Sequence, residues 1–227
     1  MHVTAPGKVV LFGEYAVLTG APAAVMAVDA YAAVNLAASH NDQWHFSSDG
    51  FVSTPHSSNG SDLPDGASAG FTTAVLEHWG YASLKELGQA PLQIHTDTTA
   101  FYQQQQKLGL GSSAAACTAT YFLLAQLLER KPKLTEALEI HRNWQGGKGS
   151  GLDVASCWSG GVIRFQNAAA RKLPWPDELK WQIVWSGTSA ITTDHIANFD
   201  QWYKNGDIEP LQRLSLLVMR QLDSSAL

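Results

Sequence analysis

The sequence predicts an α+β fold. Apolar runs with the two-residue period of β-strands are mixed with segments whose apolar residues recur at helical spacing, and they follow no steady βαβ alternation. That order argues against a doubly wound parallel sheet. The chain has 227 residues, of which 45% are hydrophobic, so it can build a real core and has room for one or two domains.

Strands are expected mainly in the first half of the chain. Val9–Phe12 is a short apolar run closed by a turn at Gly13. Small and β-branched runs predict strands at Ala23–Val28, Tyr31–Ala37 and Gln43–Val52, with Asp29 dividing the first two. Ser53–Gly66 is rich in Ser, Asn, Gly, Pro and Asp, which predicts a loop. Pro91–Thr96 alternates apolar with polar residues, as a half-buried strand does.

Helices follow where the apolar spacing changes. They are predicted at Ser68–Trp79, Ser112–Glu129, Leu134–Trp144, Val154–Trp158, Thr193–Tyr203 and Ile208–Leu222. Two later strands are expected at Gly161–Phe165 and Trp181–Trp185. A shift in composition at Gln166–Pro176, with three alanines, an Arg-Lys pair and two prolines, predicts a boundary between domains at 1–167 and 168–227.

Composition and charge exclude several classes of protein. The net charge of −5 provides no basic field for nucleic acid, so a phosphate-bearing partner must be met by local cations. No apolar run approaches the roughly 20 residues of a membrane span, and the first residues do not resemble a signal peptide. Cys117 and Cys157 lie in segments expected to be helical, which indicates buried free thiols. These features favour a cytoplasmic protein.

The segment Gly109–Ala116 is a candidate phosphate loop. Its two glycines let the backbone turn sharply and approach a ligand, and Ser112 can cap the helix that follows. The free N–H groups of the first helical turn would then face the ligand together with the helix dipole. An ordinary glycine turn with a serine cap would read the same way, so both interpretations remain open at this point.

Two better-known phosphate loops are excluded. The sequence has no Gly-x-x-x-x-Gly-Lys-Ser/Thr, so this is not a Walker loop. Gly109–Ala114 does match Gly-x-Gly-x-x-Ala, but a dinucleotide site needs a strand before it and an acid about twenty residues later on a second strand. The run Gln103–Lys107 precedes it, and the nearest acid, Glu129, falls within the predicted helix.

Two further segments contribute a lone lysine and a lone aspartate. Lys8 follows a Pro-Gly turn in an otherwise small and apolar stretch, and Asp153 follows a loop with four glycines in six residues, 146–151. A lysine there can simply extend to solvent, and an aspartate at a helix start can simply cap it. The two make chemical sense as partners, which predicts that they lie within salt-bridge reach.

Taken together, the three segments resemble the GHMP kinases. The resemblance rests on Ala-Pro-Gly-Lys-x-x-Leu-x-Gly-Glu near the N-terminus, Lys-Leu-Gly-Leu-Gly-Ser-Ser-Ala-Ala in the middle and Gly-Ser-Gly-Leu-Asp-Val-Ala after it, and it runs from about Val3 to Phe165. Within the superfamily it is closest to phosphomevalonate kinases, with mevalonate kinases next. It implies a ribosomal-protein-S5-domain-2-like N-terminal domain followed by a partial ferredoxin-like C-terminal domain, because the family's C-terminal glycine-rich motif is not found.

The resemblance also implies roles for residues. ATP and Mg²⁺ are the expected cofactors, with a small acid of the mevalonate pathway as substrate and a homodimer as the candidate assembly. Asp153 would take or orient the acceptor's proton, and Lys8 would pair with it and keep it ionised. The nucleotide would be held by Lys107, Gly109, Leu110, Gly111, Ser112, Ser113 and Ala114, with Ser113 and Ser112 toward the metal.

The acceptor is expected to carry a phosphate. Lys148, Ser150, Gly151 and Arg142 are the predicted substrate-binding residues, and Lys107 and His141 add to the local cations. Such an excess suits 5-phosphomevalonate, which would become the diphosphate. Two alternatives stay open: a mevalonate kinase, and a non-catalytic nucleotide-binding module that lacks part of the second domain.

Overall fold

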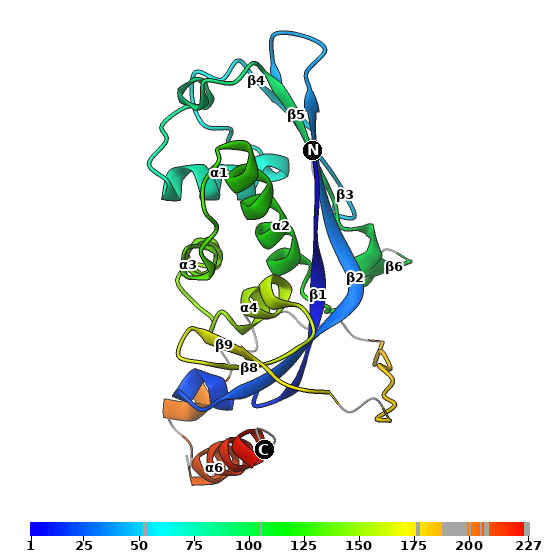
Figure 1. Cartoon of the computed structure of the whole chain (residues 1–227), viewed down its shortest axis with the longest axis vertical. Helices are drawn as coiled ribbons and strands as arrows, with labels where there is room; N and C mark the ends of the chain where they lie inside the picture. Colours follow the sequence, from blue (N-terminus) through cyan, green and yellow to red (C-terminus); the bar gives the residue numbers. More distant parts are fainter. Residues whose placement is uncertain are drawn as a thin grey trace.

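The computed structural model describes residues 1–51, 54–104, 106–175, 178–187, 199, 201–204, 206 and 209–224. One mixed sheet forms one side of the molecule, and helices gather on one of its faces (Figure 1). Three 3₁₀ turns join the chain near this core, η2 (Ala67–Ala69), η3 (Leu84–Leu87) and η4 (Thr99–Phe101), and a fourth, η1 (Ala16–Thr19), follows the first strand. The predicted α+β class is confirmed.

The described part of the chain forms a seven-stranded sheet in the order β4-β3-β5-β2-β8-β9, with β1 paired to β2. Only β3 and β5 run parallel among these pairs. The strands are β1 (His2–Phe12), β2 (Ala23–Ala38), β3 (Trp44–Asp49), β4 (His56–Ser58), β5 (Leu92–Asp97), β8 (Val162–Gln166) and β9 (Ala169–Lys172). A separate small hairpin, β6 (Tyr102–Gln103) with β7 (Gln106–Lys107), occupies the run that precedes the first glycine loop.

Strand β2 is continuous, so the expected division at Asp29 is wrong. The register with β1 jumps there: Pro6 lies opposite Tyr31, and Gly7 lies opposite Val28. Two residues of β2 therefore have no partner across the strand pair, which is a β-bulge. In the sequence, a polar residue such as Asp29 inside an apolar run suggests the end of a strand. In the structure its exposed side chain points to the outer face of the sheet.

The helices cover the other face. They are α1 (Gly70–His78), α2 (Ser112–Leu127), α3 (Leu134–Trp144) and α4 (Leu152–Ser159), in good agreement with the predicted ranges. Helix α2 is buried on almost every side because it lies between β1–β2 and the other helices. Small residues in its first half allow that close approach, so α2 lacks the single apolar stripe expected of a surface helix.

Other predicted elements agree only in part with the structure. The loop at Ser53–Gly66 contains the short strand β4. The strand predicted at Trp181–Trp185 is wrong: this stretch is irregular, and Val184 is 80% exposed, so the apolar run does not pack into the core. The helix predicted at Thr193–Tyr203 falls largely outside the described residues. The stretch expected to link two domains contains β9, which pairs with β8, and the domain division itself stays a prediction.

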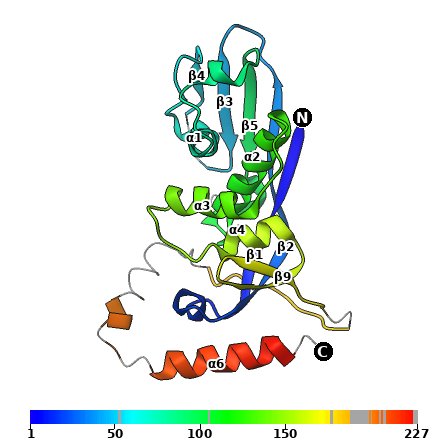
Figure 2. The ribbon, with the colours of Figure 1, turned by 60° about the vertical axis from the view of Figure 1, so that its left-hand side comes forward.

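Helix α6 (Glu209–Ser224) lies at the end of the molecule formed by η1 and the start of β2 (Figure 2). Leu211 packs against Ala16 and Ala21, and Val218 packs against Ala24. Within the described residues no helix combines the length and the apolar character needed to cross a bilayer. Cys117 and Cys157 are buried and free, as predicted, and burial raises the pKa of Cys117 to about 12.

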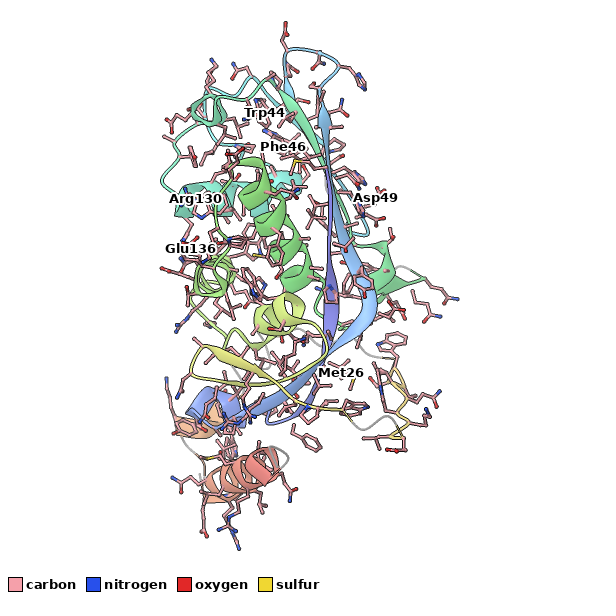
Figure 3. All side chains as sticks on the ribbon, viewed as in Figure 1. Met26, Trp44, Phe46, Asp49, Arg130 and Glu136 are labelled. Carbon is pink, nitrogen blue, oxygen red and sulfur yellow. The ribbon has the colours of Figure 1, made fainter. Side chains whose placement is uncertain are left out.

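A partly buried polar network ties α1, α2 and α3 together beyond the apolar core. Trp44 and Phe46 of β3 lie between the sheet and these helices, 2% and 0% exposed (Figure 3). On the helical side, the Glu136 carboxylate accepts hydrogen bonds from Trp79 Nε1 (3.0 Å), Tyr121 Oη (2.9 Å) and Lys133 Nζ (2.8 Å). These bonds, that of Lys133 first, lower the pKa of Glu136 to about 2.

Replacing Glu136 with Gln is expected to lower the free energy of unfolding at pH 7 by on the order of 1–2 kcal/mol, because charge-assisted hydrogen bonds are lost. The loss stays this small because Lys133 is largely exposed, so water screens its bond to Glu136. A depressed carboxyl pKa stabilises the fold above the unfolded pKa, so this difference should shrink as pH falls from about 4.5 toward about 2. Urea unfolding from pH 7 to pH 3 measures it, with the exposed Glu139→Gln as control. A difference that does not change with pH would contradict the assignment.

Candidate functional site

The site is centred on Lys8 and Asp153. Lys8 comes from β1 and Asp153 from the first turn of α4, and Lys8 Nζ lies 3.2 Å from Asp153 Oδ1. The predicted proximity of the two groups is confirmed. Their side chains are 14% and 24% exposed, so the ion pair is shielded from water yet still accessible from one side. This is the arrangement of a reactive pair at the base of a pocket rather than of a surface salt bridge.

The first glycine loop is tied directly to β1. The backbone N–H of Lys8 donates to the carbonyl oxygen of Leu110 at 2.8 Å. Gly7 makes this approach possible, because a Cβ there would lie 2.6 Å from the same oxygen. The loop therefore sits beside the lysine because the strand and the loop share a hydrogen bond. Leu110 contributes a backbone anchor, and its side chain is only half-buried.

Gly109 and Gly111 both adopt the left-handed conformation, with φ of 78° and 81°. Gly111 takes the position before α2, and no side chain caps the helix, so the expected cap by Ser112 is not made. Ser112 is instead the first residue of the helix and is buried. The first N–H groups of a helix have no acceptor within it, and here they follow a backbone turn with open space beside Gly109. Both features suit a phosphate.

The second glycine loop positions Asp153. Gly149 and Gly151 have φ of 93° and 86°, and Gly151 precedes α4. A Cβ on Gly151 would lie 2.8 Å from Leu138 Cδ2, so this glycine lets the loop pack closely on α3. No side chain caps α4, which removes the simple capping interpretation of Asp153. The Ser150 hydroxyl accepts a weak hydrogen bond of 3.4 Å from the backbone of Leu152.

The predicted cations separate into two groups. Partial desolvation and then the charge of Lys8 lower the pKa of Lys107, although Lys107 is an exposed residue and lines none of the three pockets described below. Arg142 donates from Nε to the Gly147 carbonyl oxygen at 3.1 Å, and Arg142 and Lys148 line a neighbouring pocket. His141 is not a cation: burial lowers its pKa to about 4, although Asp153 opposes the shift, so it is neutral at pH 7.

Two pockets meet at the second glycine loop. One of about 140 Å³ holds Lys8 and Asp153, and one of about 490 Å³ holds Arg142 and Lys148. They share Leu18, Gly149 and Ser150, so a small acid could extend from the ion pair to the second group of cations. A third pocket, of about 610 Å³, lies between α1 and α3 and is lined by Ile140, Asn143 and Trp144, among others.

Several residues of the site were not assigned from the sequence. Glu14 and Tyr15 line the pocket of Lys8 and Asp153. His141 lines it too, and its Nε2 lies 3.1 Å from Ser113 Oγ. The signal for His141 was present, because it belongs to the buried stripe of α3 with Ala137, Leu138 and Ile140. A histidine at a position of that stripe is expected to be buried and neutral.

The donor set suits Mg²⁺ bound together with phosphates. Mg²⁺ prefers oxygen and is usually held by one or two carboxylates plus substrate phosphates and water. Asp153 and Glu14 supply carboxylates to the pocket. Ser113 supplies a hydroxyl that lies within hydrogen-bond distance of His141, which lines the pocket. Ser112 is 5% exposed, so Ser113 is the better placed of the two serines. The described residues contain no group of three or more His, Cys, Asp or Glu that could hold a metal without the phosphates.

Comparisons with known proteins identify similar chains. The family model described as "GHMP kinases N terminal domain" matches residues 71–161. Mevalonate kinases of Pyrococcus horikoshii and Pyrococcus abyssi are 27% and 26% identical, over 88% and 92% of this chain. The chain spans 61% and 64% of the length of these two relatives.

Solved structures share the fold. A Listeria innocua protein superposes with a TM-score of 0.78 at 23% identity, covering 99% of this chain and 73% of that one. Methanococcus jannaschii mevalonate kinase gives 0.65 at 16% identity, covering 100% and 72%. Streptococcus pneumoniae phosphomevalonate kinase, solved with phosphomevalonate and AMPPNP, gives 0.59 at 22%, covering 73% and 49%. Residues 71–161 are therefore similar to the N-terminal domain of the GHMP kinases, and the fold shared with these solved structures is consistent with that match.

Proposed function

We propose that the chain phosphorylates a small acid of the mevalonate pathway with ATP. The observation that carries the proposal is the shielded Lys8–Asp153 pair, 3.2 Å apart and flanked by two glycine loops that each lead into a helix. Phosphoryl transfer needs positioning and charge neutralisation more than covalent chemistry. A carboxylate beside a lysine, next to a backbone able to hold phosphates, supplies those two requirements.

The nucleotide phosphates would bind at Gly109–Ala114. The first N–H groups of α2 would donate to them, and Lys107 and Lys8 would offset their charge. Ser113, with Ser112 as the less exposed alternative, would offer a hydroxyl oxygen to Mg²⁺, which neutralises phosphate charge when bound. The pocket of about 610 Å³ beyond α3 offers room for the rest of the nucleotide.

The acceptor would lie in the two joined pockets. Asp153 would orient the attacking oxygen and take its proton where it carries one, and Lys8 would hold the carboxylate and stabilise the charge that develops. Ser150 and Gly151 would form the wall between acceptor and catalytic pair. Arg142 and Lys148 would bind the acid group at the far end, since both line the larger pocket.

We favour 5-phosphomevalonate as the acceptor. Its phosphate would lie at the reacting end, where Lys107, whose charge interacts with that of Lys8, could bind a further anion. The second candidate is mevalonate, and the similarity to mevalonate kinases favours it. Arg142 and Lys148 do not decide between the two, because both acceptors carry the carboxylate. Lys107 is therefore the residue on which the choice depends.

The substrate test compares kcat/KM for both acceptors in the wild type and in Lys107→Met. We expect 5-phosphomevalonate to be preferred by roughly ten- to a hundredfold, because its phosphate would add a charge-assisted hydrogen bond to Lys107 that mevalonate cannot make. Lys107→Met should remove most of that preference. The control is Lys85→Met, which changes a lysine whose Nζ bonds to Ser61 away from the site. Faster turnover of mevalonate by the wild type would assign the chain to mevalonate kinase chemistry instead.

A non-catalytic module is the remaining outcome. It would bind ATP, measured by calorimetry, and turn over neither acceptor. The retained Lys8–Asp153 pair argues against it, because a nucleotide-binding module has no need of a carboxylate held beside a lysine at the acceptor pocket.

A further inference from the structure

We propose that His141 is a positioning residue that fixes the hydroxyl of Ser113 beside the first glycine loop. The inference rests on the proposed function and adds a residue that neither glycine loop contains. Nε2 of His141, in the last turn of α3, lies 3.1 Å from Oγ of Ser113, in the first turn of α2. The start of α2 and the end of α3, two consecutive helices, are thereby joined at the edge of the site.

The imidazole is held rigidly enough for this task. It is 4% exposed, and it stacks on Phe71 with ring centroids 6.4 Å apart and an angle of 23° between the planes. Phe71 in turn packs against Trp144 at 4.8 Å. The same ring lines the pocket of Lys8 and Asp153, so the side chain is fixed on one side by aromatic rings and faces the site on the other.

The chemistry of a serine hydroxyl explains why a fixed partner matters. The group has one proton and two lone pairs, and it can rotate among three staggered positions. To offer lone pairs to a cation, Ser113 must give its proton to another acceptor. Nε2 of His141 lies at the right distance for that role. In this role the ring proton would be on Nδ1, Nε2 would accept the serine proton, and the serine oxygen would be free to face the phosphates.

The reach of the side chain gives a sharp test. A Gln amide can place an oxygen near the position of Nε2, an Asn amide reaches only to that of Nδ1, and Leu accepts nothing. We therefore compare His141→Gln, His141→Asn and His141→Leu. The first readout is calorimetric binding of ATP at a series of Mg²⁺ concentrations, which needs no acceptor. Losing one hydrogen bond should raise the Mg²⁺ requirement about tenfold in the Asn and Leu variants. His141→Gln should stay within about threefold of the wild type.

A double-mutant cycle with Ser113→Ala separates positioning from a general structural effect. In the Ser113→Ala background, His141→Leu should add nothing to the Mg²⁺ requirement, because the partner hydroxyl is already gone. Glu139→Gln, exposed on the same helix, is the control for changes to α3. Circular dichroism confirms that each variant is folded, and the smaller Gln and Asn changes decide the matter if Leu unfolds the protein.

The outcomes distinguish this inference from the proposed function. Additive effects in the cycle, or equal losses in the Gln and Asn variants, would overturn the role of His141 even in an active enzyme. Coupled effects on Mg²⁺-dependent ATP binding would support the role even where the wild type turns over neither acceptor, a result that would overturn only the proposed activity.

Discussion

Replacing Asp153 with Asn is expected to reduce phosphoryl transfer by about 10²–10⁴-fold, the range typical of losing a general base. The amide has almost the same size as the carboxylate but neither its charge nor its ability to take a proton. The loss should appear in kcat, with little change in the affinity for ATP, because the proposed nucleotide site lies at α2 and Asp153 lies on α4. Steady-state kinetics with 5-phosphomevalonate and with mevalonate, together with ATP calorimetry, measure the two effects separately.

Combining this change with one at Lys8 tests whether the two residues act together. If Lys8 acts partly through Asp153, then Lys8→Met and Asp153→Asn should be far from additive when combined, since the groups lie 3.2 Å apart. Glu139→Gln provides a carboxylate-to-amide control on an exposed site. A residual kcat within about tenfold of the wild type in Asp153→Asn would be too small a loss for a general base, and it would reduce Asp153 to a structural partner of Lys8.

Much of this site was predictable because its parts are local. A glycine with φ near +80° just before a helix can be recognised from a few neighbouring residues of the sequence. Gly111 and Gly151 both adopt that conformation. The pairing of Lys8 with Asp153 followed from chemistry, since a lysine in one small and apolar segment and an aspartate after a glycine loop make sense as partners. The limits of α3 and the core of α2 were likewise given by local apolar spacing.

The remaining features depend on contacts that no local pattern records. Asp29 looked like a strand break and is part of a bulge, because the register of β1 against β2 changes there. His141 looked like one more cation, and burial against Phe71 makes it neutral. The apolar run at Trp181–Trp185 predicted a strand, but such a run forms a strand only where a neighbouring strand pairs with it and a core lies beneath it.

The contact between the first glycine loop and Lys8 predicts a second large loss of activity, on substitution of Gly111. Gly111 has φ of 81°, and a Cβ built on it would lie 2.9 Å from Lys8 Cγ and 3.0 Å from Lys8 Cε. Real Cβ atoms do not come so close, so an added methyl group must displace the lysine or the loop. Two features therefore favour glycine at this position: its backbone conformation and the lysine side chain that packs over it.

Gly111→Ala is expected to lower kcat/KM about a hundredfold, because a shift of about 1 Å in a positioning group can cost that much. Gly80→Ala is the matched control: Gly80 has φ of 85°, and its Cβ would meet nothing within 4 Å. Both variants should lose roughly 1–2 kcal/mol of stability from left-handed backbone strain, measured by urea unfolding. Only Gly111→Ala should lose turnover and ATP affinity. Equal stability losses with unchanged kinetics in both would show that the lysine accommodates the methyl group, and the loop would then need no glycine at this position for catalysis.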